Sequence, residues 1–337
     1  MEDGTAATLF LPFENGELPF PCEGARTLFL NAALPQVSGR DWRRVLECIQ
    51  GFRPNFLALE NAGYLVAPAL GAGTYSGALV LLGKHRELNR QNIHAALTQT
   101  LPGGTVVVCG AKTSGVEAMR KEMAGLLPVE RTLSKNHAQV FWFLRPERWV
   151  SPPAPQPVTV KAEGLEFWTA AGMFSHRAVD AGSQMLAGHI GDVEGKAADF
   201  GAGWGFLSAM LLRRSPSVTA LDLYEADYAS LGAAQRNIGA LSPPLPVRYH
   251  WQDLLAEPVQ TAYNAIIMNP PFHAGRSSEA SIGQRMIGAA AAALKPGGKL
   301  LMVANRELPY EDTLQRAFRR FERIDESRQF KVIRGVK

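Results

Sequence analysis

Cysteine is scarce in this chain of 337 residues. The three cysteines, Cys22, Cys48 and Cys109, lie far apart and in no paired spacing, which argues against a disulfide framework and against a structural zinc site. The histidines show no ligand spacing with each other or with cysteine either. We therefore expect no bound metal and a protein of the reducing cytoplasm.

A long apolar run is missing as well. No stretch approaches the length that a membrane-spanning helix needs. Residues 1–4 are acidic on balance and include no basic segment ahead of an apolar core, which a secretory signal requires. The sequence therefore predicts a soluble, unexported protein with no membrane partner.

The chain has only a small excess of positive charge. It contains 35 basic and 31 acidic residues, which give a net charge of +4. The excess is concentrated between Arg316 and Lys337, where eight basic and three acidic residues give a net charge of +5. Such a tail could bind RNA phosphates. It could equally form a solvated helix face and a basic edge strand that discourages aggregation. The basic residues are Arg316, Arg319, Arg320, Arg323, Arg328, Lys331, Arg334 and Lys337.

Proline is concentrated in one short segment near the middle of the chain. Residues 151–157 (Ser-Pro-Pro-Ala-Pro-Gln-Pro) hold four prolines, which sustain neither a helix nor a central strand. The length of the chain and its 46% of apolar residues suffice for two cores. We expect a first domain over residues 1–150, a semi-rigid linker over 151–160 and a second domain over 161–337.

One segment of the first half is repeated in the second half. Residues 101–104 (Leu-Pro-Gly-Gly) and the stretch Thr105–Cys109 match residues 295–298 (Lys-Pro-Gly-Gly) and Lys299–Val303 at an offset of 194 residues. Each copy has a helix-like stretch before it and another after it. The repeat predicts an α/β fold with two tandem doubly wound domains that arose by duplication.

A glycine-rich turn follows a short apolar strand in the second half. Ala197–Phe200 leads into Gly201, Gly203 and Gly205, and the apolar helical stretch Phe206–Leu212 comes next. Glycine permits positive φ and a close approach to a ligand, and the start of a helix presents unpaired N–H groups. By itself the pattern is also compatible with a plain tight turn.

Acidic residues follow the next two candidate strands. The run Val218–Leu221 ends in Asp222, where a doubly wound sheet places the carboxylate that binds ribose hydroxyls, and Glu225 is a rival for this role. Asp253 follows a further apolar and aromatic stretch. In that position its carboxylate could accept a hydrogen bond from the amino group of an adenine. A solvated loop aspartate or a helix N-cap is the alternative for Asp253.

The apolar run Ala265–Met268 is followed by Asn269, Pro270, Pro271 and Phe272. An Asn side-chain oxygen and a backbone carbonyl held by two prolines can accept both hydrogens of a planar amino group. Phe272 can stack on the ring that carries this group. A strand followed by a rigid turn is the alternative. Because ligands of open α/β sheets bind at the carboxyl ends of strands, we expect the glycine turn, the acids and Asn269 to line one crevice.

In this order the motifs resemble a known family. They are similar to class I S-adenosylmethionine-dependent methyltransferases of the small-domain group, and within it to the RsmC-like guanine-N2 methyltransferases of small-subunit ribosomal RNA. The resemblance includes residues 172–175 (Gly-Met-Phe-Ser), 178–183 (Ala-Val-Asp-Ala-Gly-Ser) and 273–275 (His-Ala-Gly). It is strong from about residue 160 onward and weaker before, and Ala202 departs from it where many relatives carry Cys.

The resemblance implies methyl transfer from S-adenosylmethionine to the exocyclic N2 amino group of a guanine in small-subunit (16S) ribosomal RNA. It also implies two Rossmann-like domains, each a mostly parallel doubly wound sheet with a C-terminal antiparallel hairpin. Asp199, Gly201 and Gly203 would hold the methionine part of the cofactor, Asp222 the ribose and Asp253 the adenine. The catalytic and substrate-binding residues would be Asn269, Pro270, Pro271, Phe272 and, as a substrate contact, His273.

The first domain has no counterpart of this chemistry. Its strand Ala78–Leu82 ends in Gly83 instead of an Asn-Pro-Pro-Phe motif, and Gly71-Ala72-Gly73 is expected to be a plain loop. We expect a degenerate methyltransferase-like domain without a cofactor site, which helps to hold RNA or shields the second domain during folding, and a monomeric protein. Candidate RNA contacts are Lys84, His85, Arg86 and Arg90.

Three alternatives for the function stay open on the sequence. The same chemistry could act on a guanine of large-subunit ribosomal RNA. Related enzymes methylate a protein glutamine with Asn-Pro-Pro-Tyr, although Phe272 and His273 speak against this substrate. The third alternative is an RNA-binding assembly factor without activity.

Overall fold

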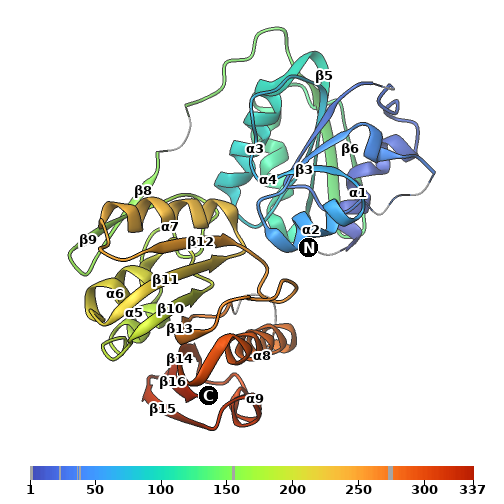
Figure 1. Cartoon of the computed structure of the whole chain (residues 1–337). Coiled ribbons are helices and arrows are strands. Elements are labelled where there is room, and N and C mark those ends of the chain that lie inside the picture. Colours follow the sequence, from blue (N-terminus) through green and yellow to red (C-terminus); the bar gives the residue numbers. More distant parts are fainter. Residues whose placement is uncertain (1–2, 23, 36, 38, 154–155, 272–275) are drawn as a thin grey trace. The chain divides into compact units, whose positions relative to one another are not determined.

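The computed structural model describes residues 3–22, 24–35, 37, 39–153, 156–271 and 276–337. The chain divides into two compact units, Met1–Gln156 and Pro157–Lys337, and each is described by itself (Figure 1). The boundary lies within the proline-rich segment, although a strand begins at Val158. Within the described ranges, no helix combines the length and the apolar character needed to cross a membrane.

The first unit is built on a seven-stranded sheet with the order β3-β2-β1-β4-β5-β7-β6. The strands from β3 to β5 run parallel, and β7 and β6 run antiparallel at one side. Its elements are α1 (Asp3–Glu14), β1 (Thr27–Leu30), η1 (Trp42–Arg44), β2 (Leu46–Ile49), α2 (Arg53–Asn61), β3 (Leu65–Ala67), β4 (Tyr75–Leu81), α3 (Arg86–Gln99), β5 (Thr100–Ala111), η2 (Lys112–Ser114), α4 (Val116–Ala124), β6 (Arg131–Lys135) and β7 (Ala138–Leu144).

The second unit repeats this plan after a short hairpin, with the sheet order β12-β11-β10-β13-β14-β16-β15. Both sheets are therefore mostly parallel and end in an antiparallel pair, so the predicted fold class is confirmed. The elements are β8 (Val158–Ala162), β9 (Leu165–Thr169), α5 (Ala181–Ala187), β10 (Gly195–Phe200), α6 (Phe206–Arg214), β11 (Val218–Glu225), α7 (Tyr228–Ala240), β12 (Val247–Trp251), β13 (Tyr263–Met268), α8 (Arg276–Ala293), β14 (Leu294–Asn305), α9 (Glu311–Ala317), β15 (Arg320–Glu326) and β16 (Phe330–Val336).

The two faces of the second sheet are covered by different helices. Because successive side chains of a strand point to opposite faces, alternate residues of β10, β11 and β13 belong to two separate cores. One core, around Leu221 and Ile267, is closed by α5, α6 and α7. The other, around Ala198 and Ile266, is closed by α8 and α9. This alternation decides which strand residues can reach a site on the α5–α7 face.

The predicted repeat at β5 and β14 extends to the details of the backbone. Both strands are 12 residues long and occupy the fifth place of their sheets. Gly103 and Gly297 have the same positive φ of 77°. The pairing with the preceding strand is irregular at the same point, after Tyr75 in the first unit and after Tyr263 in the second. Two copies of one folding unit explain this agreement, since the two sequences share little else here.

A buried polar cluster connects three strands of the second sheet. The Asp222 carboxylate of β11 accepts a hydrogen bond from the Tyr263 hydroxyl at 2.6 Å and pairs with the Lys196 ammonium at 3.0 Å. Lys196 also lies 5.1 Å from the centre of the Tyr263 ring. Only 1% of the Asp222 surface is exposed, and both partners bind Oδ2, so they compensate for the lost hydration of that oxygen. The buried Oδ1 has no hydrogen-bond partner among the described residues.

The first unit contains the same cluster at equivalent positions. Glu47 of β2 accepts from the Tyr75 hydroxyl at 2.8 Å and pairs with the Arg26 guanidinium, which lies 5.1 Å from the centre of the Tyr75 ring. The strand registers of the two units match. Glu47 pairs with Leu28, two residues after Arg26, and Asp222 pairs with Ala198, two residues after Lys196. The cluster is thus a shared structural feature of both sheets.

Candidate active site

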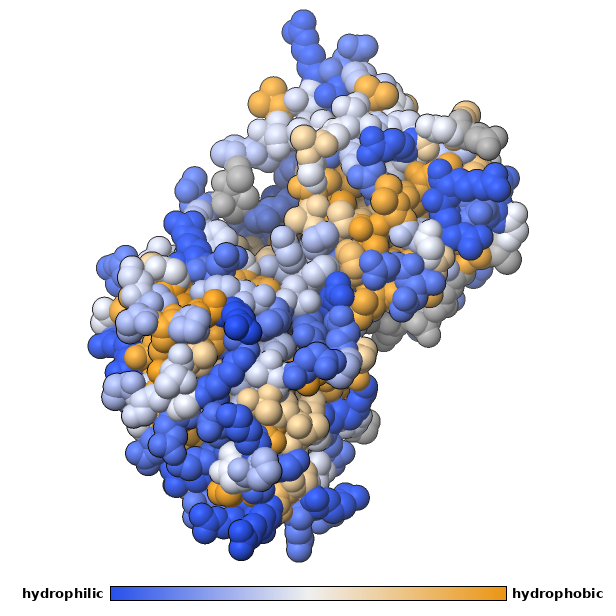
Figure 2. Space-filling model, in the orientation of Figure 1, coloured by the Kyte–Doolittle hydropathy of each residue, from blue (hydrophilic) through white to orange (hydrophobic). Residues whose placement is uncertain are grey.

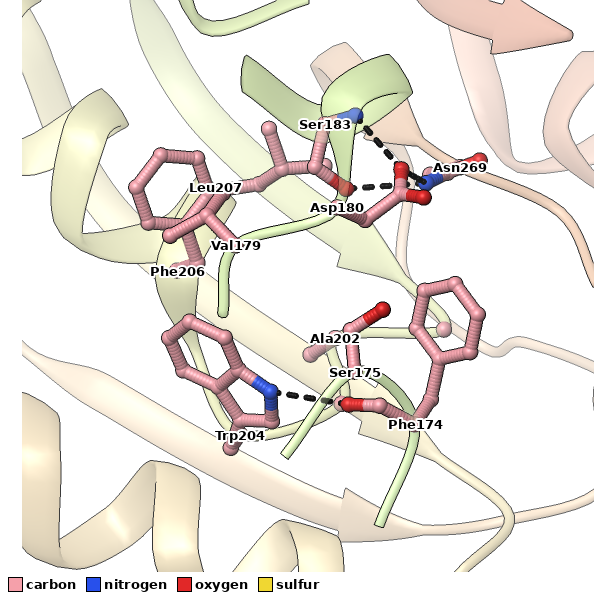
Figure 3. A pocket seen from close by; sticks show the side chains of 12 residues that line it. Phe174, Ser175, Val179, Asp180, Ser183, Ala202, Trp204, Phe206, Leu207 and Asn269 are labelled. Carbon is pink, nitrogen blue, oxygen red and sulfur yellow. Dashed lines mark hydrogen bonds between the residues drawn. The ribbon is translucent and has the colours of Figure 1, made fainter. Parts of the chain in front are cut away.

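A pocket opens at the carboxyl ends of β10 and β13 in the second unit (Figure 3). It contains about 420 Å³ of empty space that is open to solvent. The glycine turn after β10, the segment before α5 and the residue after β13 form its walls. Its lining residues are Phe174, Ser175, Val179, Asp180, Ser183, Gly201, Ala202, Gly203, Trp204, Phe206, Leu207 and Asn269.

The glycine turn has the backbone conformation that its sequence requires. Gly201, Gly203 and Gly205 have φ values of 80°, 54° and 91°, in the region where a side chain would be strained. The Gly201 N–H donates to the Tyr224 carbonyl at 2.9 Å, and the Gly203 N–H donates to Glu225 Oε2 at 2.8 Å. The turn is therefore fixed against the end of β11, and its backbone forms part of the pocket wall.

Asp199 lies one residue before the end of β10 and is fully buried. Its Oδ2 accepts from the Ser208 hydroxyl at 2.7 Å, while its buried Oδ1 has no hydrogen-bond partner among the described residues. Burial raises the pKa of Asp199 to about 7, and the neighbouring carboxylate of Glu225 contributes in the same direction. A cationic or N–H-bearing ligand group would satisfy this carboxylate and lower its pKa.

The structure corrects the prediction for Asp222. Strand β11 runs three residues beyond Asp222 and ends at Glu225. Asp222 points to the α8–α9 face of the sheet, where Tyr263 and Lys196 bind its carboxylate, whereas Asp199 and Asn269 belong to the opposite face. Asp222 therefore does not reach the pocket and cannot hold a ribose there.

Glu225, the rival residue, lies on the same face of the sheet as Asp199 and Asn269, although it is outside the residues that line the pocket. It ends β11 beside the glycine turn, with Oε2 on the Gly203 N–H and Oε1 on the Asp227 N–H, both at 2.8 Å. Burial raises the pKa of Glu225 to about 7, against the lowering effect of these N–H groups. Its carboxylate is thus fixed in orientation at the end of the strand.

Asp253 follows β12 and is half-buried, outside the residues that line the pocket. Its Oδ1 accepts from the Leu255 N–H at 2.8 Å, and its carbonyl accepts from Ala256 and Glu257. The alternative of a turn-stabilising loop aspartate is therefore realised for one of its two oxygens. A contact of the other oxygen with adenine stays a prediction.

Asn269 is the first residue after β13 and lines the pocket. Its Nδ2 donates to Asp180 Oδ2 at 2.9 Å and to the Ser183 hydroxyl at 2.8 Å. Its Oδ1 is buried and has no hydrogen-bond partner among the described residues. In Figure 3 this oxygen lies on the side of the amide away from Asp180 and Ser183. An acceptor is thus available to a ligand donor.

The remaining residues of the predicted catalytic motif are described only in part. Pro270 is buried and Pro271 is exposed, directly after Asn269. Phe272 and His273 lie outside the described residues. Their proposed stacking and substrate contacts stay predictions.

Four further residues of the pocket have no role predicted from the sequence: Asp180, Ser183, Phe174 and Trp204. The first three lie in segments that resemble the family. Asp180 is the N-cap of α5 and accepts from the Ser183 N–H at 2.8 Å. The Trp204 indole N–H donates to the Phe174 carbonyl at 3.0 Å and ties the glycine turn to the segment before α5. An aspartate three residues before a serine at a helix start is a recognisable capping signal, but it does not indicate a partner on β13.

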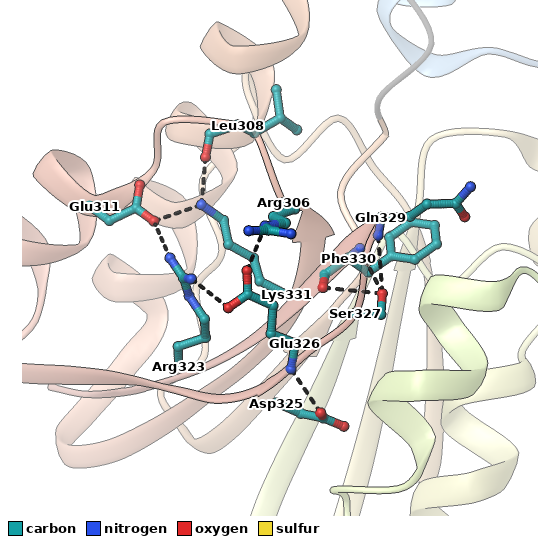
Figure 4. Close-up of polar contacts among 10 residues, drawn as sticks. All are labelled: Arg306, Leu308, Glu311, Arg323, Asp325, Glu326, Ser327, Gln329, Phe330 and Lys331. Carbon is teal, nitrogen blue, oxygen red and sulfur yellow. Dashed lines mark hydrogen bonds and ion pairs between the residues drawn. The ribbon is translucent and has the colours of Figure 1, made fainter.

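The basic tail is largely bound within the protein (Figure 4). Lys331 is 1% exposed, and its ammonium donates to the Leu308 carbonyl and to Glu311 at 2.7 and 2.6 Å. Arg323 pairs with Glu326 at 2.7 Å and with Glu311 at 3.4 Å. These contacts favour the structural interpretation for much of the tail. Hydrophilic residues do gather over the α9–β15–β16 end in Figure 2. The exposed basic residues of the tail are Arg316, Arg319, Arg320, Arg323, Arg328 and Lys337.

Two of the four candidate RNA contacts of the first unit are held by one carboxylate. Arg86 pairs with Glu122 at 2.8 Å, and Arg90 donates to the same group. Hydrogen bonding from Arg90 is the main reason why the pKa of Glu122 falls to about 2. Lys84 and His85 are exposed and remain candidates.

Across the part of the chain that the structure describes, no group of three His, Cys, Asp or Glu side chains could hold a metal ion.

The chain is similar to a family of methyltransferases. The family model for the methyltransferase small domain matches residues 164–334. The ribosomal RNA small subunit methyltransferase C of Chromohalobacter salexigens is 31% identical over 315 residues, 91% of each chain. That of Shewanella loihica is 28% identical over 265 residues, 77% of this chain and 76% of the relative.

A solved structure is similar over both units. The T. thermophilus 16S rRNA N2 G1207 methyltransferase (RsmC), in complex with AdoMet and guanosine, has a TM-score of 0.80 and 25% identity, over 99% of this chain and 91% of that chain. The chain therefore belongs to the methyltransferase small-domain family and, within it, to the ribosomal RNA small subunit methyltransferase C group.

Proposed function

We propose that the chain transfers a methyl group from S-adenosylmethionine to the exocyclic N2 amino group of a guanine in 16S ribosomal RNA. The observation that carries this proposal is the free, buried Oδ1 of Asn269 in a pocket that is also walled by the glycine turn. The similar T. thermophilus structure contains both AdoMet and guanosine, which supports the cofactor and the type of substrate.

The cofactor part of the pocket fits the groups of S-adenosylmethionine. The orphaned Oδ1 of Asp199 suits the amino end of the methionine part, and the glycine turn leaves room for it because no Cβ fills the space at Gly203. We assign the ribose hydroxyls to Glu225 and the adenine to Asp253. When bound, the cofactor supplies a methyl group that is already activated by its sulfonium, so the protein contributes positioning.

The acceptor part of the site holds the amino group of the guanine. Asn269 Oδ1 and the Pro270 carbonyl would accept its two hydrogens and turn its lone pair toward the methyl group. Phe272 would stack on the base, a contact worth roughly 1–3 kcal/mol. A paired base cannot enter such a pocket, so the guanine must be unpaired or flipped out of its helix.

We propose that residues 1–150 form a degenerate domain without a cofactor site, joined through residues 151–160 to the catalytic domain 161–337. By strand register, Phe29 stands where the second unit has Asp199, and Leu81 where it has Asn269. Gln50 stands in place of Glu225, 3% exposed, and its amide nitrogen donates to the Ala32 carbonyl. Neutral or apolar side chains thus stand at the positions equivalent to these three polar residues of the site.

This assignment predicts one cofactor per chain. Calorimetric titration of the full-length protein with S-adenosylmethionine should give a stoichiometry of about one, and Glu225→Ala should weaken this binding. Gln50→Ala, at the equivalent position of the first unit, should leave it unchanged. A second binding event that survives Glu225→Ala would contradict a cofactor-free first domain.

Cofactor affinity should fall as the pH drops through about 7. The pKa values of Asp199 and Glu225 in the free protein are both about 7, so lower pH neutralises the two carboxylates that meet a cationic cofactor. Each group should cost up to about tenfold in affinity one pH unit below its pKa. Titrations at several pH values should show a weaker pH dependence in Glu225→Gln, since glutamine does not ionise. Because the ligand is the same in both titrations, its own ionisation cancels in the comparison. An unchanged dependence in this variant would exclude Glu225 as a contributor.

The RNA substrate can be tested by subunit preference. Labelled S-adenosylmethionine should methylate small subunits or their RNA in preference to large subunits and their RNA. Preferential label in large subunits would favour the related guanine-N2 reaction there. Label in protein would favour methylation of a glutamine side chain.

We place the activity in the cytoplasm with the ribosomes and expect a monomer.

A further inference from the structure

The Asn269 amide is held by two side chains from a distant part of the sequence. Its Nδ2 donates to Asp180 Oδ2 at 2.9 Å and to Ser183 Oγ at 2.8 Å. Both partners belong to the start of α5, 89 and 86 residues before Asn269. All three residues line the same pocket, so the contact is part of the site and not of the core (Figure 3).

The chemistry of these partners fixes which end of the amide faces the pocket. An ionised carboxylate only accepts hydrogen bonds, so the amide must present its NH₂ group to Asp180. The Ser183 hydroxyl accepts the second hydrogen. Both N–H bonds are then used, and among the described residues nothing binds the remaining group of the amide, the Oδ1 acceptor. A flipped amide would instead present a donor to the amino group of the substrate.

Asp180 and Ser183 are themselves held in place. Asp180 Oδ2 accepts from the Ser183 backbone N–H at 2.8 Å as the N-cap of α5, so the carboxylate has one defined place. Gly182 leaves space for it, because a Cβ there would lie 3.0 Å from Asp180 Oδ2 and 3.1 Å from the Phe330 ring. The orientation of Asn269 is thus set before a ligand enters.

We propose that Asp180 and Ser183 are positioning residues of the methyl transfer, which hold the Asn269 amide with its oxygen toward the amino group of the substrate. This inference rests on the proposed function, because it assigns a role only through Asn269. It deepens that function by separating the group that contacts the substrate from the two groups that orient it.

A double-mutant cycle tests the role of Asp180. Single-turnover methylation should be up to roughly 100-fold slower in Asp180→Ala, because a misplaced catalytic group costs that much. In an Asn269→Ala background, Asp180→Ala should cost no further rate, since nothing is left to orient. Calorimetric S-adenosylmethionine affinity should stay within about twofold in all three variants. An equal, additive loss in both backgrounds would overturn the proposal in favour of a general structural role.

Two further variants control for folding. Asp227→Ala removes the N-cap of α7, which accepts from the Ser230 N–H at 2.9 Å, and so reproduces the loss of a cap away from Asn269. It should lower thermal stability about as much as Asp180→Ala without the same loss of rate, measured at saturating S-adenosylmethionine because the Asp227 backbone N–H also binds Glu225. Ser183→Ala keeps the backbone N–H of the cap and should also slow the reaction, while Ser183→Thr should restore it.

The outcomes separate this inference from the proposed function. A fully active Asn269→Ala enzyme would overturn the proposed function itself. A slow Asn269→Ala enzyme together with a wild-type rate in Asp180→Ala and Ser183→Ala would overturn only the positioning role.

Discussion

Asn269→Ala should lower the rate of methyl transfer on the order of 100- to 1000-fold, by analogy with the loss of one preorganised hydrogen-bonding group at a reacting centre. The buried Oδ1 of Asn269 is free to accept from the amino group, and alanine offers no acceptor there. S-adenosylmethionine should bind with nearly unchanged affinity, because Asp199 and Glu225 are untouched. Single-turnover rates and calorimetry on the same preparation measure both quantities.

Asn264→Ala is a matched control for this variant. Asn264 lies on β13, the strand that Asn269 follows, five residues earlier. Its Oδ1 accepts from the Lys196 N–H and the Lys295 ammonium, away from the residues that line the pocket. Its loss should affect stability and leave the rate within a few-fold of wild type. Loss of cofactor binding in Asn269→Ala, or a similar loss of rate in Asn264→Ala, would contradict the role assigned to Asn269.

Asp222→Ala and Glu225→Ala should have opposite effects. Asp222→Ala removes the acceptor of Tyr263 and the partner of Lys196 inside the sheet, and should destabilise the second unit by about 3 kcal/mol, typical of breaking a buried pair. The folded fraction should still bind S-adenosylmethionine normally. Glu225→Ala should be less destabilising, because it removes the acceptor of two backbone N–H groups but breaks no buried ion pair. It should bind the cofactor roughly 10- to 100-fold more weakly, the loss expected for a charged hydrogen-bonding group.

The first unit supplies the control for Asp222. Glu47→Ala breaks the equivalent cluster with Tyr75 and Arg26 and should destabilise the first unit instead. Urea unfolding followed by hydrogen exchange of the β10–β11 and β1–β2 amides distinguishes the units. Weak cofactor binding by folded Asp222→Ala, with normal binding by Glu225→Ala, would return the ribose role to Asp222.

The confusion between these two acids shows where inference from sequence stops. The glycine turn and Asn269 could be predicted because their signals are local: glycines at positive φ, and a polar residue directly after an apolar run. Strand ends are less well marked. The stretch Leu223–Glu225 continues β11 past Asp222, and a shift of three residues moves a side chain to the other face of a sheet. The acid predicted for the ribose, Asp222, thus lies on the face of β11 that points away from the pocket.

Contacts between distant segments were beyond the sequence. Asp180 and Ser183 could be recognised as the start of a helix, but their bonds to Asn269 cross 89 and 86 residues. The charge of the tail was visible, yet the pairing of Lys331 with Glu311 depends on how β16 packs beside the start of α9. The repeat at β5 and β14 was predictable, whereas the matching clusters around Glu47 and Asp222 were not, because they share residue types only loosely.

The most direct test of the proposed reaction is the identity of the methylated nucleoside. Small subunits or their RNA are incubated with the protein and labelled S-adenosylmethionine, digested to nucleosides and separated. The proposed function predicts N2-methylguanosine as the labelled product, formed by wild type and by Asn264→Ala but nearly absent with Asn269→Ala. Label in another nucleoside, or in protein, or an equal yield from Asn269→Ala, would contradict it.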